Sequence, residues 1–85
     1  MSANDDIENK LEVLFAELIA HQRQKVLAAA HRLNPRLTED DIAQPHDFAE
    51  LATSAEWNYE DGILAGYLAA QMAVRAKLQI GRAHV

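Results

Sequence analysis

Apolar residues recur every three or four positions over the first third of the chain. Two such series run side by side: Ile7, Leu11, Leu14 and Leu18 form the first, and Phe15, Ile19, Val26, Ala30 and Leu33 form the second. This spacing is that of the apolar stripe of an amphipathic α-helix. The pattern ends at Asn34-Pro35, and a residue that precedes proline is pushed out of the helical region. We therefore predict a long helix over about residues 6–33.

Five consecutive polar residues, His21 to Lys25, interrupt this pattern. Gln22 falls close to the apolar stripe at this point. Either its side chain finds a hydrogen-bond partner, or the stripe leaves the core and the helix breaks near residues 21–25. The sequence leaves both outcomes open.

The segment over about residues 37–56 carries the signals of two helix starts. Thr38 is a suitable N-cap, and Asp41 three residues later completes a variant of the capping box. Pro45 requires this first short helix to end by Gln44. Asp47 and Glu50 have the same spacing, so we predict a second short helix that begins at Asp47. The connector is therefore expected to be helical.

The last third of the chain repeats the helical spacing. Asn58 is a good N-cap residue and Asp61 follows it at the matching distance. One stripe is made by Tyr59, Ile63, Tyr67, Ala70, Val74 and Leu78. We predict a second long helix over about residues 58–78.

Together these elements predict an all-α fold. One domain over residues 1–79 holds two long antiparallel helices, a helical hairpin, joined by the short helical connector. A chain of this length buries only about two-thirds of the surface that its unfolded form exposes. It has no cysteine for a disulfide, so oligomerisation is the expected source of further stability. The expected partner is a second copy, as a homodimer in a four-helix arrangement, or another protein.

Gly62 and Gly66 lie one turn apart within the second long helix. A glycine in a helix interior costs about 1 kcal/mol relative to alanine, so two of them need a structural reason. The absence of side chains would let another helix come close. We therefore predict a face for helix packing and self-association, made of Gly62, Gly66, Ala69, Ala70 and Ala73.

The net charge of −5 is unevenly distributed. Residues 37–61 hold eight acids and no Lys or Arg, and residues 62–85 hold three bases and no acid. No basic stripe is present, which argues against nucleic-acid binding. An antiparallel pair of helices would place His31, Arg32 and Arg36 near Glu56, Glu60 and Asp61, and Asp5, Asp6 and Glu8 near Arg75 and Lys77.

Candidate chemistry is sparse. Glu17 and His21 share one helix face, but the Glu-x-x-His motif of di-iron bundles and the His-Glu-x-x-His motif of zinc proteases are both missing. Glu56 or Glu60 beside an aromatic residue is a candidate acid or base, but no nucleophile with a partner base accompanies it. Ser54 is expected to cap or turn the chain before Trp57. We predict no catalytic, metal-binding or cofactor-binding residue.

A partner surface is a stronger candidate. It gathers Phe48, Trp57 and Tyr59 with Glu56 and Glu60. Aromatic residues are enriched at interface hot spots, and an acidic rim would steer a basic partner. The alternative is that Phe48 and Trp57 only plug the end of the hairpin.

The last six residues, Ile80 to Val85, have a different expected origin. A widely used sequencing adapter, read as ATC-GGA-AGA-GCA-CAC-GTC-TGA, encodes Ile-Gly-Arg-Ala-His-Val and a stop codon. We expect residues 80–85 to be adapter read-through and the natural chain to continue differently after about Leu78. An adapter-free read of the source gene that still encodes these six residues would contradict this.

The sequence predicts a non-enzymatic protein–protein interaction or assembly module in the cytoplasm. Its longest apolar run, Ile63 to Val74, contains Gln71 and falls short of the roughly 20 residues that span a bilayer, so no membrane contact is expected. One alternative is a small acidic helical regulator, of the antitoxin type, that binds a basic partner. Another is a carboxylate-dependent or metal-dependent enzyme.

Overall fold

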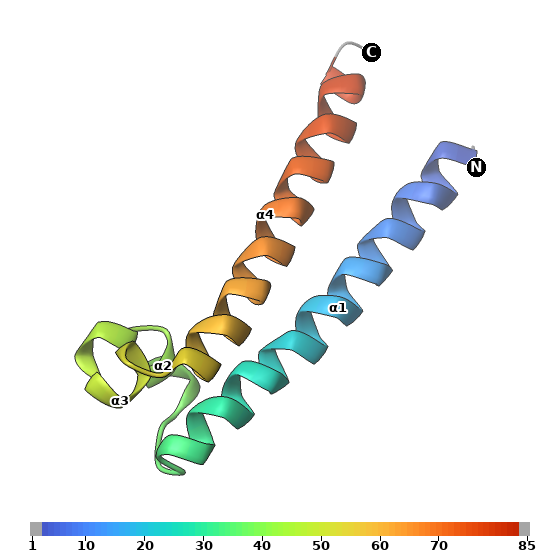
Figure 1. Ribbon diagram of the computed structural model, residues 1–85. Coiled ribbons are helices and arrows are strands. Elements are labelled where there is room, and N and C mark those ends of the chain that lie inside the picture. Colours follow the sequence, from blue (N-terminus) through green and yellow to red (C-terminus); the bar gives the residue numbers. More distant parts are fainter. Residues whose placement is uncertain (1–2, 84–85) are drawn as a thin grey trace.

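The computed structural model describes the backbone of residues 3–83 and the side chains of residues 5–78. Two long helices, α1 (Ala3–Leu33) and α4 (Ala55–Ala83), run antiparallel and side by side (Figure 1). Between them lie α2 (Glu39–Ile42), a 3-10 turn η1 (Pro45–Asp47) and α3 (Ala49–Ala52). These short elements gather at one end of the pair, and no strand occurs in the described range. The predicted all-α helical hairpin is confirmed.

Helix α1 continues without a break through residues 21–25. Gln22 is only 3% exposed. Its Nε2 donates to the backbone carbonyl oxygen of Glu60 at 2.8 Å and to the Glu60 carboxylate at 2.9 Å. A buried amide needs such partners. Of the two outcomes that the sequence left open, the structure shows that Gln22 finds a partner across the hairpin.

The two predicted helix starts of the connector have opposite outcomes. At α2 the capping box is present, because Thr38 Oγ1 accepts from the Asp41 amide at 3.1 Å and Asp41 Oδ2 accepts from the Thr38 amide at 2.9 Å. The predicted start at Asp47 is wrong. Pro45 opens a 3-10 turn that uses Asp47 as its last residue, so α3 begins after Phe48 and has no side-chain cap.

Helix α4 begins three residues earlier than predicted. Ser54 Oγ accepts the backbone N–H of Trp57 at 3.1 Å, which confirms that Ser54 caps the chain before Trp57. The predicted N-cap, Asn58, lies inside α4. Its side-chain amide instead donates to the carbonyl oxygens of Leu51, Ala52 and Ser54, at 3.3, 3.1 and 2.7 Å. Asn58 thus ties the end of α3 to α4.

The backbone of α4 is helical past the predicted end at Leu78, as far as Ala83. The side chains after Leu78 and the whole of residues 84 and 85 lie outside the described part of the chain. The expected adapter origin of residues 80–85 concerns these residues and stays a prediction.

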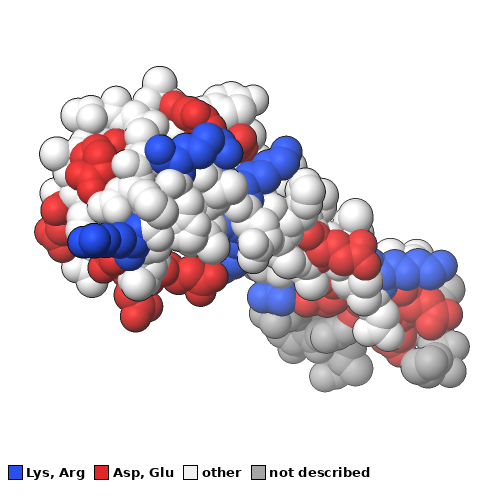
Figure 2. Space-filling view, turned by 90° about the horizontal axis from the view of Figure 1, so that it is seen from below, with Lys and Arg blue, Asp and Glu red and all other residues white. Residues whose placement is uncertain are grey.

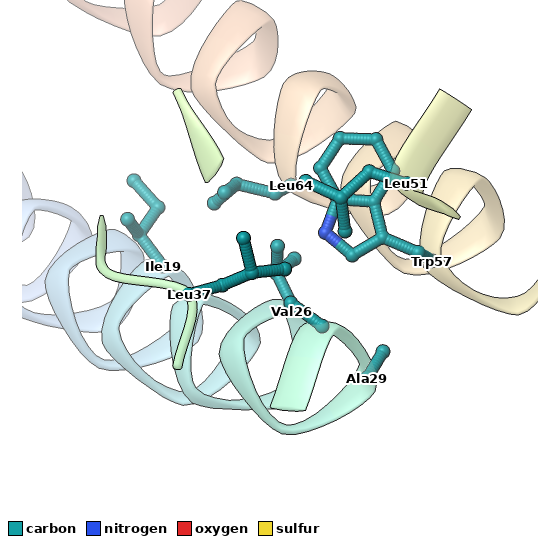
Figure 3. Packing of buried hydrophobic residues seen from close by; sticks show 8 residues of the cluster. Ile19, Val26, Ala29, Leu37, Leu51, Trp57 and Leu64 are labelled. Carbon is teal, nitrogen blue, oxygen red and sulfur yellow. The ribbon is translucent and has the colours of Figure 1, made fainter. Parts of the chain in front are cut away.

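The buried core lies at the connector end. It consists of Ile19, Val26, Ala29, Ala30, Leu37, Leu51, Trp57 and Leu64. Figure 3 shows Leu51, Trp57 and Leu64 on one side of this cluster and Ile19 and Val26 of α1 on the other, with Leu37 between. The imidazole of His31 donates from Nε2 to the carbonyl oxygen of Leu37 at 2.8 Å and holds the first connector turn against α1.

The rest of the hairpin has no buried residue. Over residues 5–18 of α1 and 65–78 of α4, every described side chain is exposed or half-buried. We call these two stretches the open half. The connector folds back over the other end (Figure 1), and within the open half Phe15, Tyr67 and Leu68 pack against the edge of the core.

Candidate interaction surface

Two exposed ion pairs mark the two sides of the hairpin. On one side Arg32 of α1 contacts Glu56 of α4, as the sequence predicted. On the other side Arg75 binds Glu12 through two hydrogen bonds, at 2.8 and 2.6 Å. The sequence placed Arg75 near more N-terminal acids, and it is Glu12 that the guanidinium reaches. The hydrogen bond from Arg75 holds the pKa of Glu12 below its ordinary value.

The side marked by Arg32 and Glu56 becomes apolar in the open half. Leu14 lies 18 residues before Arg32, and Val74 lies 18 residues after Glu56. Eighteen residues make five full helical turns, so Leu14 is in line with Arg32 along α1, and Val74 is in line with Glu56 along α4. Because Arg32 and Glu56 touch, Leu14 and Val74 lie on the same side of the hairpin.

Six further apolar residues lie within about a sixth of a turn of these two lines. The whole set, which we call the apolar face, is Ile7, Leu11, Leu14 and Leu18 of α1 with Ile63, Tyr67, Val74 and Leu78 of α4. By the same geometry, Lys10, Glu17 and Lys77 lie at the edges of this set. Ile7 and Leu14 are 54% and 49% exposed, and the other six are half-buried. Uncovered large apolar side chains on two neighbouring helices are typical of a contact surface.

The opposite side is partly covered by the connector. There α2 borders a shallow groove of about 230 Å³, lined by Arg23, Val26, Leu27, Glu39, Ile42, Ala43, Asp61 and Leu64. Partial burial raises the pKa of Asp61, so this group lowers the stability as the pH rises from the ordinary aspartate pKa to the raised one. The groove is smaller than the roughly 300–1,000 Å³ of most small-molecule sites.

The structure places the residues of the predicted partner surface in different environments, and their role in partner binding stays a prediction. Trp57 is 2% exposed and lies in the core, with Phe48 half-buried against it, so Trp57 is unavailable for contact on the surface of this chain. Tyr59 is 69% exposed. Glu56 binds Arg32 and Glu60 accepts from Gln22. Trp57 instead fills the end of the hairpin, which was the alternative expected from the sequence.

The acids of residues 37–61 do not form a purely acidic surface in the folded chain. Figure 2 views the connector end and shows Asp and Glu side chains spread over it, with Lys and Arg side chains between them. Arg23 lies at the groove beside Glu39 and Asp61, and Arg32 contacts Glu56. Folding therefore brings bases of α1 next to the acids of residues 37–61.

The glycine and alanine face points away from α1. Gly62, Gly66, Ala69, Ala70 and Ala73 are all exposed. A Cβ added at Gly62 or Gly66 would meet nothing within 4 Å. The glycines therefore do not let α1 and α4 approach one another. Self-association through this face stays a prediction.

Replacing both glycines tests that prediction. If the face is open to solvent, Gly62→Ala with Gly66→Ala should stabilise the fold by about 1–2 kcal/mol, because each alanine restricts the unfolded chain and favours the helix. Thermal unfolding followed by circular dichroism measures the change. A lower melting temperature, together with a smaller mass in solution, would show that another helix does pack closely on the glycines.

Sequence reasoning missed the apolar face, although its residues were visible as two stripes. Both stripes of α1 were assigned to one helix face, but the structure separates them. Phe15, Ile19 and Val26 point to α4, while Ile7 and Leu14 stand at the uncovered edge. The signal that could have separated them is the one-residue offset between the two series.

Over the described residues, no group of three or more His, Asp or Glu side chains is placed to hold a metal ion. None of the helices, over the same part of the chain, has the length and hydropathy needed to cross a membrane. Comparisons of this chain with protein-family models, with curated proteins and with solved structures gave no match.

Proposed function

We propose that this protein is a non-enzymatic helical assembly module whose apolar face is completed by another protein surface. The observation that carries the proposal is the apolar face: eight large apolar residues on two neighbouring helices, none of them buried.

The shape of the chain supports this proposal. The hairpin measures 49 × 19 × 19 Å with a radius of gyration of 16.5 Å, whereas a compact domain of this length has about 12 Å. The chain is one layer of two helices, and domains are built from two or more packed layers. Full burial of a leucine or isoleucine contributes about 1.5–3 kcal/mol, so covering the apolar face would add several kcal/mol.

The second candidate is a small acidic regulator that binds a basic partner. It is favoured by Glu39 and Asp61 at the groove, above the apolar side chains of Val26, Ile42 and Leu64. Arg23 at the same groove reduces the negative potential that a basic partner would meet. The apolar face is larger and carries no such conflict, so the assembly module is the better supported function.

The native mass of the protein in cell extract tests the proposed function. A tagged wild-type chain should elute from a sizing column in a complex well above its own 9.5 kDa. Leu14→Gln with Val74→Gln should shift it to the mass of the single chain, because both residues lie on the apolar face. Val13→Gln serves as the control, since Val13 is 57% exposed and points away from α4. A wild-type chain that elutes as a monomer would contradict the proposal.

A further inference from the structure

We propose that the groove beside α2 binds a small zwitterion with an apolar body, of the class of the free aliphatic amino acids. Asp61 and Glu39 receive its ammonium group, and Arg23 receives its carboxylate. The groove lies on the side of the hairpin opposite the apolar face, so this inference goes beyond the proposed function and does not depend on it.

Three elements meet at this groove and supply charges of both signs. Arg23 comes from α1, Glu39 from α2 and Asp61 from α4. Gln22 and Glu60, the residues just before Arg23 and Asp61, are joined by hydrogen bonds, so the base and the acid lie at the same level of the hairpin. Within the described part of the chain, none of the three charged side chains forms an ion pair or a hydrogen bond. All three are therefore open to a ligand.

Asp61 gains most from a bound cation. It is half-buried, and this burial raises the pKa of its carboxyl, because a carboxylate that is withdrawn from water loses part of its solvation. An ammonium group beside it forms charge-assisted hydrogen bonds that replace the lost water. Glu39, which is exposed at the same groove, adds a second negative charge.

The groove also has an apolar lining. Val26 and Leu64 are buried, and Leu27 and Ile42 are half-buried. Their branched side chains offer dispersion contacts to a bound hydrocarbon group and shield it from water on one side. A ligand that fits the groove therefore carries an apolar body as well as charge.

The mixed charge of the lining selects a zwitterion. A ligand with only a positive charge is repelled by Arg23, and a ligand with only a negative charge is repelled by Asp61 and Glu39. Groups that line one small groove lie closer together than the Debye length of about 8 Å at physiological salt, so salt does not remove these repulsions. A ligand with both charges pairs with the acids and the base at once.

The volume of the groove restricts the ligand to a small molecule. It is about 230 Å³, below the range of most drug-sized ligands. A cavity of about 150 Å³ is enough for benzene, so the groove has room for a branched aliphatic side chain. Leucine is the probe that combines such a side chain with the two charged groups.

Titration of the isotope-labelled full chain with leucine, followed by the NMR shifts of its backbone amides, tests this site. We expect saturable shifts that concentrate on the residues of the groove. A ligand this small on an open groove should have a dissociation constant in the millimolar range. The absence of a saturable shift up to the solubility limit of leucine would overturn the proposal.

Three further probes each remove one part of leucine. Isopentylamine lacks the carboxylate, isocaproate lacks the amine, and glycine lacks the apolar body. We expect each of them to bind several-fold more weakly than leucine. If isopentylamine or isocaproate binds as tightly as leucine, the groove does not recognise both charges, and the zwitterionic ligand is wrong.

Charge-matched variants locate the site. Arg23→Gln and Asp61→Asn should each weaken leucine binding about tenfold, the order expected for the loss of a hydrogen bond to a charged group. Asp61→Asn should keep the fold, because burial disfavours only the charged form. Lys25→Gln and Asp47→Asn make the same charge changes at exposed residues outside the groove and should leave binding unchanged. Equal affinities for all four variants would overturn the proposal.

Discussion

Trp57→Ala should remove most of the stability of this protein. Trp57 is 2% exposed and packs with Leu51, which is fully buried, at the end of the hairpin. Truncating a buried tryptophan costs about 3–5 kcal/mol, and a domain of this size has only about 4–13 kcal/mol in total. At about 4–8 °C for each kcal/mol, the midpoint of thermal unfolding should fall by roughly 12–40 °C.

Two variants control for this result. Tyr59→Ala, two residues along the same helix, removes an aromatic ring that is 69% exposed and should change the free energy of unfolding by no more than about 0.5 kcal/mol. Trp57→Phe should be milder than Trp57→Ala, because the indole Nε1 is buried without a hydrogen-bond partner among the described residues and its loss breaks no bond. Equal melting temperatures for Trp57→Ala and Tyr59→Ala would contradict the position of the core.

Leu14→Gln should weaken self-association strongly. In the single chain Leu14 is 49% exposed, and a substitution at such a position ordinarily changes the free energy of unfolding by about 0.5 kcal/mol or less. In a homodimer joined through the apolar face, the same side chain would be buried in both copies. The loss of about 1–2 kcal/mol at each copy raises the dissociation constant about 30-fold to 1,000-fold, since 1.4 kcal/mol is a factor of ten.

The adjacent residue offers a matched control. Val13 is 57% exposed, but one residue along a helix is a rotation of about 100°, which takes Val13 away from the apolar face. Val13→Gln should leave the dissociation constant unchanged. The measurement is the dependence of the thermal midpoint on protein concentration, which a dimer shows and a monomer does not. Equal behaviour of the two variants would mean that Leu14 is as free of contact as Val13.

The sequence was enough to predict an interaction when both of its residues lie within one helical turn. Thr38 and Asp41 are three residues apart, and their capping box could be predicted and is present. The start of α4 could not be chosen in the same way, because Ser54 and Asn58 are both good N-cap residues. A tertiary contact decides which of the two is the N-cap, because the side-chain amide of Asn58 donates to carbonyl oxygens at the end of α3.

The dependence on tertiary contacts also explains why the apolar face could not be recognised from the sequence. Helical spacing identified nearly every residue of the apolar face, but it cannot show which side of a hairpin the connector covers. That depends on where α2 packs, and its Ile42 and Glu39 lie at the groove on the side opposite the apolar face. The glycines show a related limit: their spacing indicates a face of small side chains, but not whether any helix lies against it.

A hairpin with a core at one end and an open half at the other has a direct consequence for how the protein works. The connector end holds the buried residues and the Gln22–Glu60 hydrogen bonds, so it fixes the pairing of α1 with α4. The open half then presents two helices at a set spacing. Contacts of the proposed partner with the open half would need no rearrangement of the core.

Sedimentation equilibrium of the purified wild-type chain over a range of concentrations tests directly whether two copies associate through the apolar face. The account predicts a reversible dimer with twice the 9.5 kDa mass of the chain, which Leu14→Gln dissociates and Val13→Gln does not. A single species of 9.5 kDa at every concentration, with the same melting temperature for wild type and Leu14→Gln, would contradict it.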